Sequence, residues 1–227
     1  MHVSDVPRSW FPAEFNPADL PFRDYDASYA QTLLDEAGWI DSNGNGIRDQ
    51  YGMELTLRLV TTERRPVRQA YQEAIRDYLL AVGIGAELSA IPVIDLIGEN
   101  GPWLSHDFDL MLFSLLPDVL SPNSPPDLFG CEGITTRVNL DGLNGSGFCS
   151  KAHDLAAEWV QTTVDPADRM RYHRIVEFEM YEAAFWHGLY LRPTWYALSP
   201  DGWSEDNFQF MGTLPNNTFS RIEFWQR

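Results

Sequence analysis

Two cysteines, Cys131 and Cys149, are the residues whose type and spacing most directly suggest chemistry in this chain. A bond between them would close a loop rich in Pro, Gly, Asn and Ser, and would stabilise the fold by about 3 kcal/mol by restricting the unfolded chain. Two other interpretations stay open: a pair of reduced, buried thiols, or a zinc site completed by His153. Two Cys and one His form an incomplete zinc set, so the sequence favours a disulfide and an oxidising compartment.

A second candidate for chemistry is the segment 41–49, called here the 41–49 loop. Its polar residues occupy positions 1, 3, 5 and 9 of a calcium-binding loop, and they are Asp41, Asn43, Asn45 and Asp49. The twelfth position is a glycine, so the bidentate glutamate of an EF-hand is missing. The pattern therefore favours an Asn-Gly-rich turn whose side chains bond their own backbone, with a weak calcium site as the alternative.

Catalytic groups find little support in the sequence. Ser146 lies in Asn-Gly-Ser-Gly-Phe, which lacks the first glycine of a nucleophile elbow. The histidines show no ligand spacing, and His173 lies on the apolar stripe of its predicted helix, where a satisfied core residue is the expected role. We therefore expect a protein that is not an enzyme and that carries no cofactor.

Composition limits the classes of partner. The chain has 33 acidic and 16 basic residues, giving a net charge of −17. Such a surface repels phosphate backbones, which argues against nucleic acids and anionic lipid. No run of about 18 apolar residues is present, so we expect no membrane insertion. Aromatic residues make up 13% of the chain, and some are expected to line a groove.

The start of the chain conflicts with the expected compartment. Residues 1–10 lack the basic start and the apolar stretch of a signal peptide. An oxidising location and a missing signal are compatible if Met1 is an internal position of a longer gene product, and this is what we expect.

Hydrophobic spacing predicts the elements of the first half. Apolar residues recur every three or four positions over 27–37 and 67–82, and a glycine follows each run, as expected for helices. The apolar stripe of the second helix is expected to face the core. Further predicted elements are strands at 53–62, 84–91 and 108–116 and a short helix near 93–99. The order strand–helix–strand predicts parallel pairing through a right-handed crossover. The fold that we expect is α/β, with a mixed sheet covered by helices.

The second half combines a long loop with two helices. Residues 117–149 are dense in Pro, Gly, Asn and Ser, and such a long loop is unusual without a function. Helices are predicted at 151–163 and at 165–186. The residues of the first helix expected to turn inward are Ala152, Leu155, Ala156, Trp159 and Val160. The second helix starts with an aspartate N-cap followed by proline. Further strands are expected at 189–199 and 222–225.

Several motifs of the chain resemble one protein family. Residues 25–52 read YDASYAQTLLDEAGWIDSNGNGIRDQYG. This stretch is similar to the signature of the family 5 extracellular solute-binding proteins, the oligopeptide and dipeptide receptors of bacterial ABC importers. The similarity continues, in the order of the family, through residues 82–84, 108–110, 165–169 and 189–193. It covers nearly the whole chain, and the motifs belong to the C-terminal portion of longer family members.

The resemblance implies an architecture and a role. The fold would be the C-terminal lobe of a two-lobed periplasmic-binding-protein-like structure of class II. In it, 1–25 would be an extended wrapping segment, 26–199 the ligand-binding lobe and 200–227 its C-terminal return segment. The chain would be a fragment of a receptor that binds a small solute, such as a peptide, between two lobes and delivers it to a permease. Its other partner would be the missing N-terminal lobe, through which it would be anchored at the membrane surface, in the periplasm or outside the cell.

The resemblance also implies ligand-binding residues. An aspartate matching Asp118 holds the ligand's α-ammonium group in peptide-binding members, and an arginine matching Arg65 binds the ligand's carboxylate. Dipeptide receptors also have a cysteine pair like the one here. The open alternatives are an aspartate that only starts a turn and solvated arginines. The candidate pocket walls are Leu115, Asn144 and Phe148.

The chain departs from the family pattern at two places. Ser114 and Leu115 stand where members often have Gly-Trp ahead of the aspartate, and Val67 replaces a tyrosine after the Arg-Pro pair. The identity of the solute therefore stays open, and the chain alone is expected to bind it weakly or not at all. The alternatives from other classes are an extracellular carbohydrate-active hydrolase or accessory domain, and a calcium-stabilised interaction module.

Overall fold

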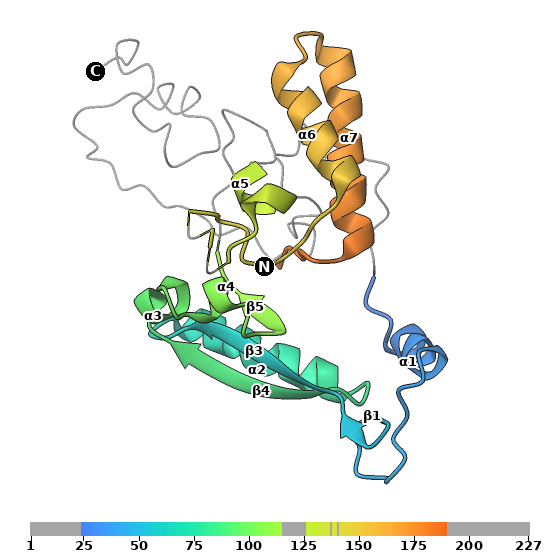
Figure 1. Ribbon diagram of the computed structural model, residues 1–227. Coiled ribbons are helices and arrows are strands. Elements are labelled where there is room, and N and C mark those ends of the chain that lie inside the picture. Colours follow the sequence, from blue (N-terminus) through green and yellow to red (C-terminus); the bar gives the residue numbers. More distant parts are fainter. Residues whose placement is uncertain (1–23, 115–125, 137, 140, 190–227) are drawn as a thin grey trace, which may run out of the picture. The chain divides into compact units, whose positions relative to one another are not determined.

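A computed structural model of the chain describes residues 24–114, 126–136, 138–139 and 141–189 (Figure 1). Several predictions lie wholly or almost wholly outside these residues: the segments 1–25 and 200–227 and the strands at 189–199 and 222–225. Two of the predicted ligand-binding residues, Leu115 and Asp118, lie outside them too.

Helix α1, Ala27–Glu36, confirms the first predicted helix. The Asp26 carboxylate accepts a 2.8 Å bond from the Tyr29 amide and so caps the first turn. Gly38 adopts φ +84° just after the helix, a left-handed conformation that costs glycine little. No residue of α1 is fully buried.

The central sheet of the described residues contains three parallel strands in the order β4-β3-β5. Their bounds are β3 Thr56–Thr62, β4 Gly85–Ile91 and β5 Leu110–Leu112. Helix α2, Pro66–Leu80, connects β3 to β4 and packs on both strands (Figure 1). The predicted strand–helix–strand unit with parallel pairing is therefore confirmed, and the fold is mixed α/β.

The predicted strand at 53–62 was wrong in two respects. It is divided, because β2 (Met53–Glu54) pairs antiparallel with β1 (Asp49–Gln50), and β3 begins only at Thr56. The prediction also gave this strand one wet face, whereas its last four residues, 59–62, are all buried. The reason is position: β3 is the central strand, so its residues are covered on both faces.

Helix α2 turns a different face to the sheet than its apolar stripe predicted. Val67 is 58% exposed and Tyr78 is 60% exposed. The buried residue of α2 is Gln72, whose amide nitrogen donates to the carbonyls of Leu59 (2.6 Å) and Ser89 (2.9 Å). A buried amide needs such partners, and here they are backbone groups of β3 and β4.

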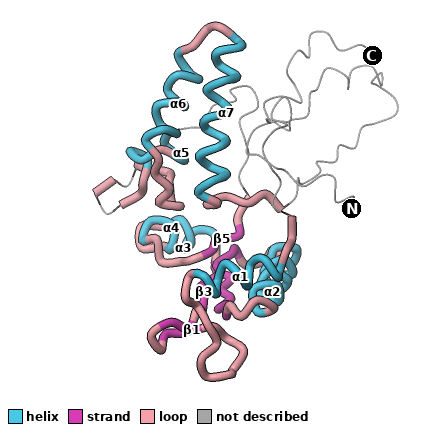
Figure 2. The backbone as a smooth tube through the Cα atoms, turned by 90° about the vertical axis from the view of Figure 1, so that its right-hand side faces the viewer, coloured by secondary structure: helices cyan, strands magenta, loops and turns pink. Residues whose placement is uncertain are grey.

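Short helices and a helical hairpin complete the described residues (Figure 2). The short elements are α3 (Val93–Ile97), α4 (Pro102–Ser105), α5 (Pro126–Phe129) and η2 (Cys131–Gly133). Helices α6, Lys151–Thr162, and α7, Pro166–Ala183, lie side by side in both views. Ser150 and Asp165 cap them, as side-chain acceptors for their first amides. None of the described helices is long and apolar enough to cross a membrane.

The inward face of α6 agrees with the predicted one at Ala156 and Val160, which are buried, and differs from it at the other predicted positions. Leu155 and Trp159 are 46% and 39% exposed, and the Trp159 ring lies against Tyr172 with centroids 4.8 Å apart. The buried residues of α6 are His153, Ala156, Ala157 and Val160. Two alanines on this face allow close approach of α7, so the bulky residues flank the contact instead of filling it.

Candidate functional site

The carboxyl edge of the sheet gathers basic and aromatic groups. Strand β3 ends at Thr62 and β5 at Leu112, and ligands of α/β sheets bind beyond such ends. The Arg68 guanidinium donates to the Thr62 hydroxyl (2.5 Å) and lies 5.0 Å from the centroid of the Phe113 ring. Arg68, from α2, thereby links the ends of β3 and β5.

Arg65 lies at the same edge. It is the N-cap of α2, its side chain makes no capping hydrogen bond, and it is exposed. Its neighbour Arg64 has φ +56° and an ion pair with Glu63 at 3.2 Å. Asp118, outside the described residues, follows β5 in the chain. Ligand binding by Arg65 and Asp118 stays a prediction.

The predicted disulfide is present. The sulfur atoms of Cys131 and Cys149 are 2.06 Å apart and their Cα atoms 4.5 Å apart. The Cys131 amide donates to the Asp154 carboxylate of α6 at 3.1 Å, which ties the start of the disulfide loop (131–149) to the hairpin. An oxidising compartment agrees with this bond.

Asn144 closes the same loop a second time. Its side chain is fully buried, and its amide nitrogen donates to the carbonyls of Gly130 (2.9 Å) and Phe148 (2.8 Å). These are the residues just before the two cysteines. The amide oxygen accepts from the Ser146 hydroxyl at 2.6 Å. Asn144 therefore duplicates the closure made by the disulfide.

Phe148 contributes an aromatic contact to the end of the disulfide loop. Its ring stacks on Phe185 with centroids 4.1 Å apart and meets His153 edge-on at 5.2 Å. The structure thus gives Phe148 and Asn144 a role in holding the disulfide loop. Their role as walls of a ligand pocket stays a prediction.

Two residues that the sequence analysis did not single out also hold the disulfide loop. The ring nitrogens of His106 lie 3.0 Å from the Gly145 carbonyl oxygen and 2.7 Å from that of Thr135. The Trp103 indole packs so closely on Gly145 that a Cβ there would collide with it. No local sequence pattern predicts these contacts, because they join residues far apart in the sequence.

The 41–49 loop is satisfied by its own backbone. The Asp41 carboxylate accepts bonds from the amides of Gly44, Asn45 and Gly46 at 2.8 to 3.1 Å. The Asp49 carboxylate accepts from the Ser42 amide (2.9 Å) and hydroxyl (2.8 Å). These bonds are those of the predicted turn, and calcium binding stays a prediction.

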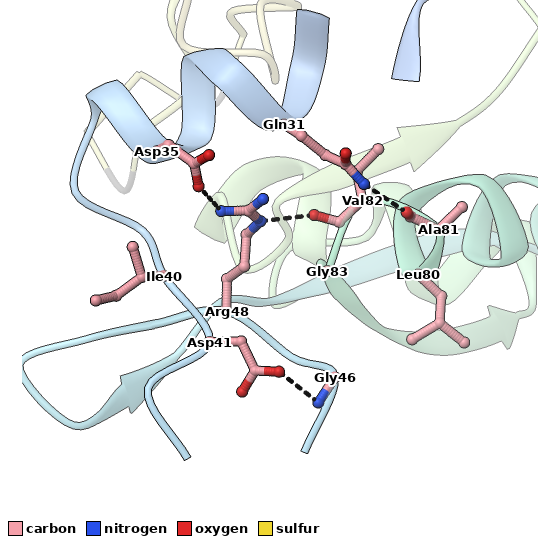
Figure 3. A pocket seen from close by; sticks show the side chains of 10 residues that line it. All are labelled: Gln31, Asp35, Ile40, Asp41, Gly46, Arg48, Leu80, Ala81, Val82 and Gly83. Atoms are coloured by element: carbon pink, nitrogen blue, oxygen red, sulfur yellow. Dashed lines mark hydrogen bonds and ion pairs between the residues drawn. The ribbon is translucent and has the colours of Figure 1, made fainter. Parts of the chain in front are cut away.

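A polar hollow of about 340 Å³ lies beside this loop (Figure 3). Its central cation is Arg48, which donates to the Asp35 carboxylate and to the carbonyls of Trp39 (2.6 Å) and Val82 (2.8 Å). Gln31 of α1 donates to the Ala81 carbonyl at 3.2 Å. The polar side chains of the hollow thus join α1 to the end of α2, which is a structural role.

Comparison with known proteins decides the family. The Bacterial extracellular solute-binding proteins, family 5 Middle, match residues 4–136. The chain belongs to this family. It is 30% identical over 122 residues to the oligopeptide-binding protein AppA of Bacillus subtilis, a match covering 52% of this chain and 22% of that protein. It is 27% identical over 157 residues to a probable ABC transporter-binding protein of Deinococcus radiodurans, a match covering 65% and 25%.

Solved structures confirm that the fold is that of part of such proteins. AppA in complex with a nonapeptide has a TM-score of 0.66 at 20% identity, covering 82% of this chain and 37% of that one. The oligopeptide-binding protein of Thermus thermophilus, complexed with a pentapeptide, has 0.73 at 19% identity, covering 82% and 33%. NikZ from Campylobacter jejuni, in complex with Ni(L-His), has 0.60 at 21%, covering 77% and 33%. The chain thus spans about a quarter of the curated relatives' length.

Proposed function

We propose that this chain supplies part of the solute-binding site of an ABC-importer receptor. It would form the C-terminal lobe of the class II two-lobed fold and bind a small solute, without chemistry, against an N-terminal lobe. The observation that carries this proposal is the family match over residues 4–136. It favours a receptor over a carbohydrate-active hydrolase. Delivery to a permease, in the periplasm or outside the cell, belongs to the same proposal.

The site would lie at the carboxyl edge of the parallel sheet. Arg65 and Arg68 bring positive charge there, and Phe113 brings an aromatic face. Asp118 would pair with the α-ammonium group of a peptide and Arg65 with its carboxylate, since charge-assisted bonds are among the stronger polar contacts. Peptides are the proposed solutes because two similar structures hold a nonapeptide and a pentapeptide.

Nuclear magnetic resonance tests this site on the 227-residue chain, because it detects weak complexes. We expect a short peptide with free ends to shift the backbone signals of Arg65 and Arg68, with a Kd of about 1 mM or weaker, since one lobe offers half the contacts. N-acetylation of the peptide should remove the contribution of Asp118, and C-terminal amidation that of Arg65.

Matched variants separate these roles. Asp118→Asn should weaken binding about tenfold and abolish the effect of acetylation, while Asp24→Asn, at an exposed aspartate, should leave both unchanged. Equal shifts with free and acetylated peptide would contradict the role of Asp118. Micromolar binding by this chain alone would contradict a site shared between two lobes.

A further inference from the structure

The environment of His106 contains more acceptors than a neutral imidazole can serve. Nδ1 lies 3.0 Å from the Gly145 carbonyl oxygen, and Nε2 lies 2.7 Å from the Thr135 carbonyl oxygen. Carbonyl oxygens only accept hydrogen bonds. A neutral imidazole donates from one nitrogen and presents a lone pair on the other, whereas the protonated ring donates from both. Only protonated His106 therefore makes both bonds.

Both acceptors belong to the disulfide loop. Thr135 lies in the first half of this loop and Gly145 in the second. The two halves are joined there by the Thr135 amide, which donates to the Asn144 carbonyl oxygen at 3.2 Å. His106 follows α4, in a left-handed conformation with φ 54°. Its ring thus bridges the segment between β4 and β5 to two points of the disulfide loop.

Neighbouring contacts fix this approach. The Trp103 indole packs on Gly145, and the Thr135 hydroxyl donates to the Trp103 carbonyl at 3.2 Å. Thr135 is fully buried and His106 is half-buried. None of these neighbouring contacts uses a proton of the imidazole. Deprotonation therefore removes one hydrogen bond and places a lone pair of a ring nitrogen against a lone pair of the carbonyl oxygen that it faces.

The hydrogen-bonding groups that face the His106 ring are uncharged. From the disulfide loop, the ring faces two carbonyl oxygens and the Thr135 hydroxyl. Glu132 and Asp141, the charged residues of this loop that the structure describes, are exposed. On its own segment the next residue is Asp107, whose carboxylate is ion-paired with Arg58.

We propose that His106 is a positioning residue whose protonated ring clamps the disulfide loop to the segment that follows α4. The disulfide loop is held more tightly when this ring is protonated than when it is neutral. Any effect on solute capture rests on the proposed function, because the predicted anchor Asp118 precedes the disulfide loop in the chain. The clamp itself acts without a solute.

Amide hydrogen exchange of the full chain tests the clamp without a ligand. The amides of Thr135 and Asn144 report on the loop, since they bond to the carbonyls of Asn144 and Gly133. After correction for intrinsic exchange, their protection should fall roughly tenfold in a series of rising pH as the His106 ring loses its proton, because one charged hydrogen bond is lost. The midpoint should coincide with the titration of the His106 ring, followed by nitrogen NMR.

Two variants separate the clamp from general effects of pH. His106→Gln should lower protection at the acid end of the series to the wild-type level at its alkaline end, and should abolish the pH dependence. His187→Gln, the same change at an exposed histidine, should keep the wild-type profile. Should His106→Gln not fold, the wild-type titration still decides: loop protection that does not change while the His106 ring titrates overturns the proposal. Peptide binding plays no part in this readout, so it separates the clamp from the proposed function.

Discussion

Two loops of this chain, the 41–49 loop and the disulfide loop, are both rich in glycine and asparagine but are held in opposite ways. In the 41–49 loop, Asp41 bonds to amides three to five residues away. In the disulfide loop, Asn144 reaches Gly130 at 14 residues and His106 reaches Gly145 at 39 residues. One loop is closed by its own sequence, the other by distant segments.

Burial divides the two loops in the same way. The polar side chains of the 41–49 loop are mostly exposed, and water can replace a lost bond. In the disulfide loop, Asn144 and Thr135 are fully buried, as are His153 and His173 of the adjoining hairpin. An equal loss of hydrogen bonds should therefore cost more in the second region, because a buried group without a partner keeps its desolvation penalty.

The largest expected effect comes from removing the covalent closure. Replacing both cysteines, as Cys131→Ser with Cys149→Ser, should lower the free energy of unfolding by about 3 kcal/mol, measured by urea denaturation. The added entropy of the unfolded chain is the cause. A loss below about 1 kcal/mol would show that Asn144 and its neighbours close this loop without the disulfide.

The second-largest effect should come from acid, which protonates His173 in the hairpin of α6 and α7 and lowers the free energy of unfolding. Burial, and then the nearby charge of Arg169, lowers the pKa of His173 to about 4. Between the ordinary histidine value of about 6.5 and about 4, the unfolded chain binds the proton more readily than the folded one. Stability from neutral His173 is therefore complete above about pH 6.5 and is lost as the pH falls, by on the order of 2–3 kcal/mol at about pH 4.5.

Urea denaturation of wild type and of His173→Phe at several pH values measures this contribution. The variant should have a shallower loss of stability in acid. An identical slope in both proteins would contradict the assignment to His173. The stability that neutral His173 contributes is lost as the pH falls, whereas the His106 clamp is strongest when its ring is protonated. The two histidines therefore have opposite effects in one series of pH values.

A single pair of identical substitutions compares the loops directly. Asn144→Ala should lower the free energy of unfolding by about 2 kcal/mol, because the buried carbonyls of Gly130 and Phe148 lose their donor. Asn43→Ala, which removes one exposed bond to the Asn45 amide, should cost less than about 1 kcal/mol. Equal costs, measured by urea denaturation, would contradict the difference between the loops.

The smallest effects should come from the 41–49 loop itself. Asp41→Ala should cost about 1 kcal/mol, since solvent takes over part of the three amide bonds. With its carboxylates already bonded, we expect calcium or a chelator to shift the melting temperature by less than about 2 °C. A calcium-dependent rise of several degrees, absent in Asp41→Ala, would favour the calcium site instead.

Much of the fold could be predicted from local pattern. The cap at Asp165, the glycine after α1, the parallel strand–helix–strand unit and the disulfide were all predicted and are present. The face of α2 could not be predicted, since its stripe of apolar residues does not show that Gln72 would bond to two strands. For the inward side of α6, the prediction held at Ala156 and Val160 but was wrong at Leu155 and Trp159, because the small residues of this helix are the ones that pack on α7.

Within the candidate site, the sequence identified segments, such as the cysteine pair and the 41–49 loop, but it did not predict the contacts between distant segments. The family, the cysteine pair and the self-bonded 41–49 loop follow from residues close together in the chain, whose geometry the backbone limits. Tertiary structure alone decided that Asn144 joins the two ends of its loop, that β3 is central, and that both nitrogens of His106 meet carbonyl oxygens. Such contacts join segments whose approach depends on the packing of the whole unit, and no local spacing encodes it.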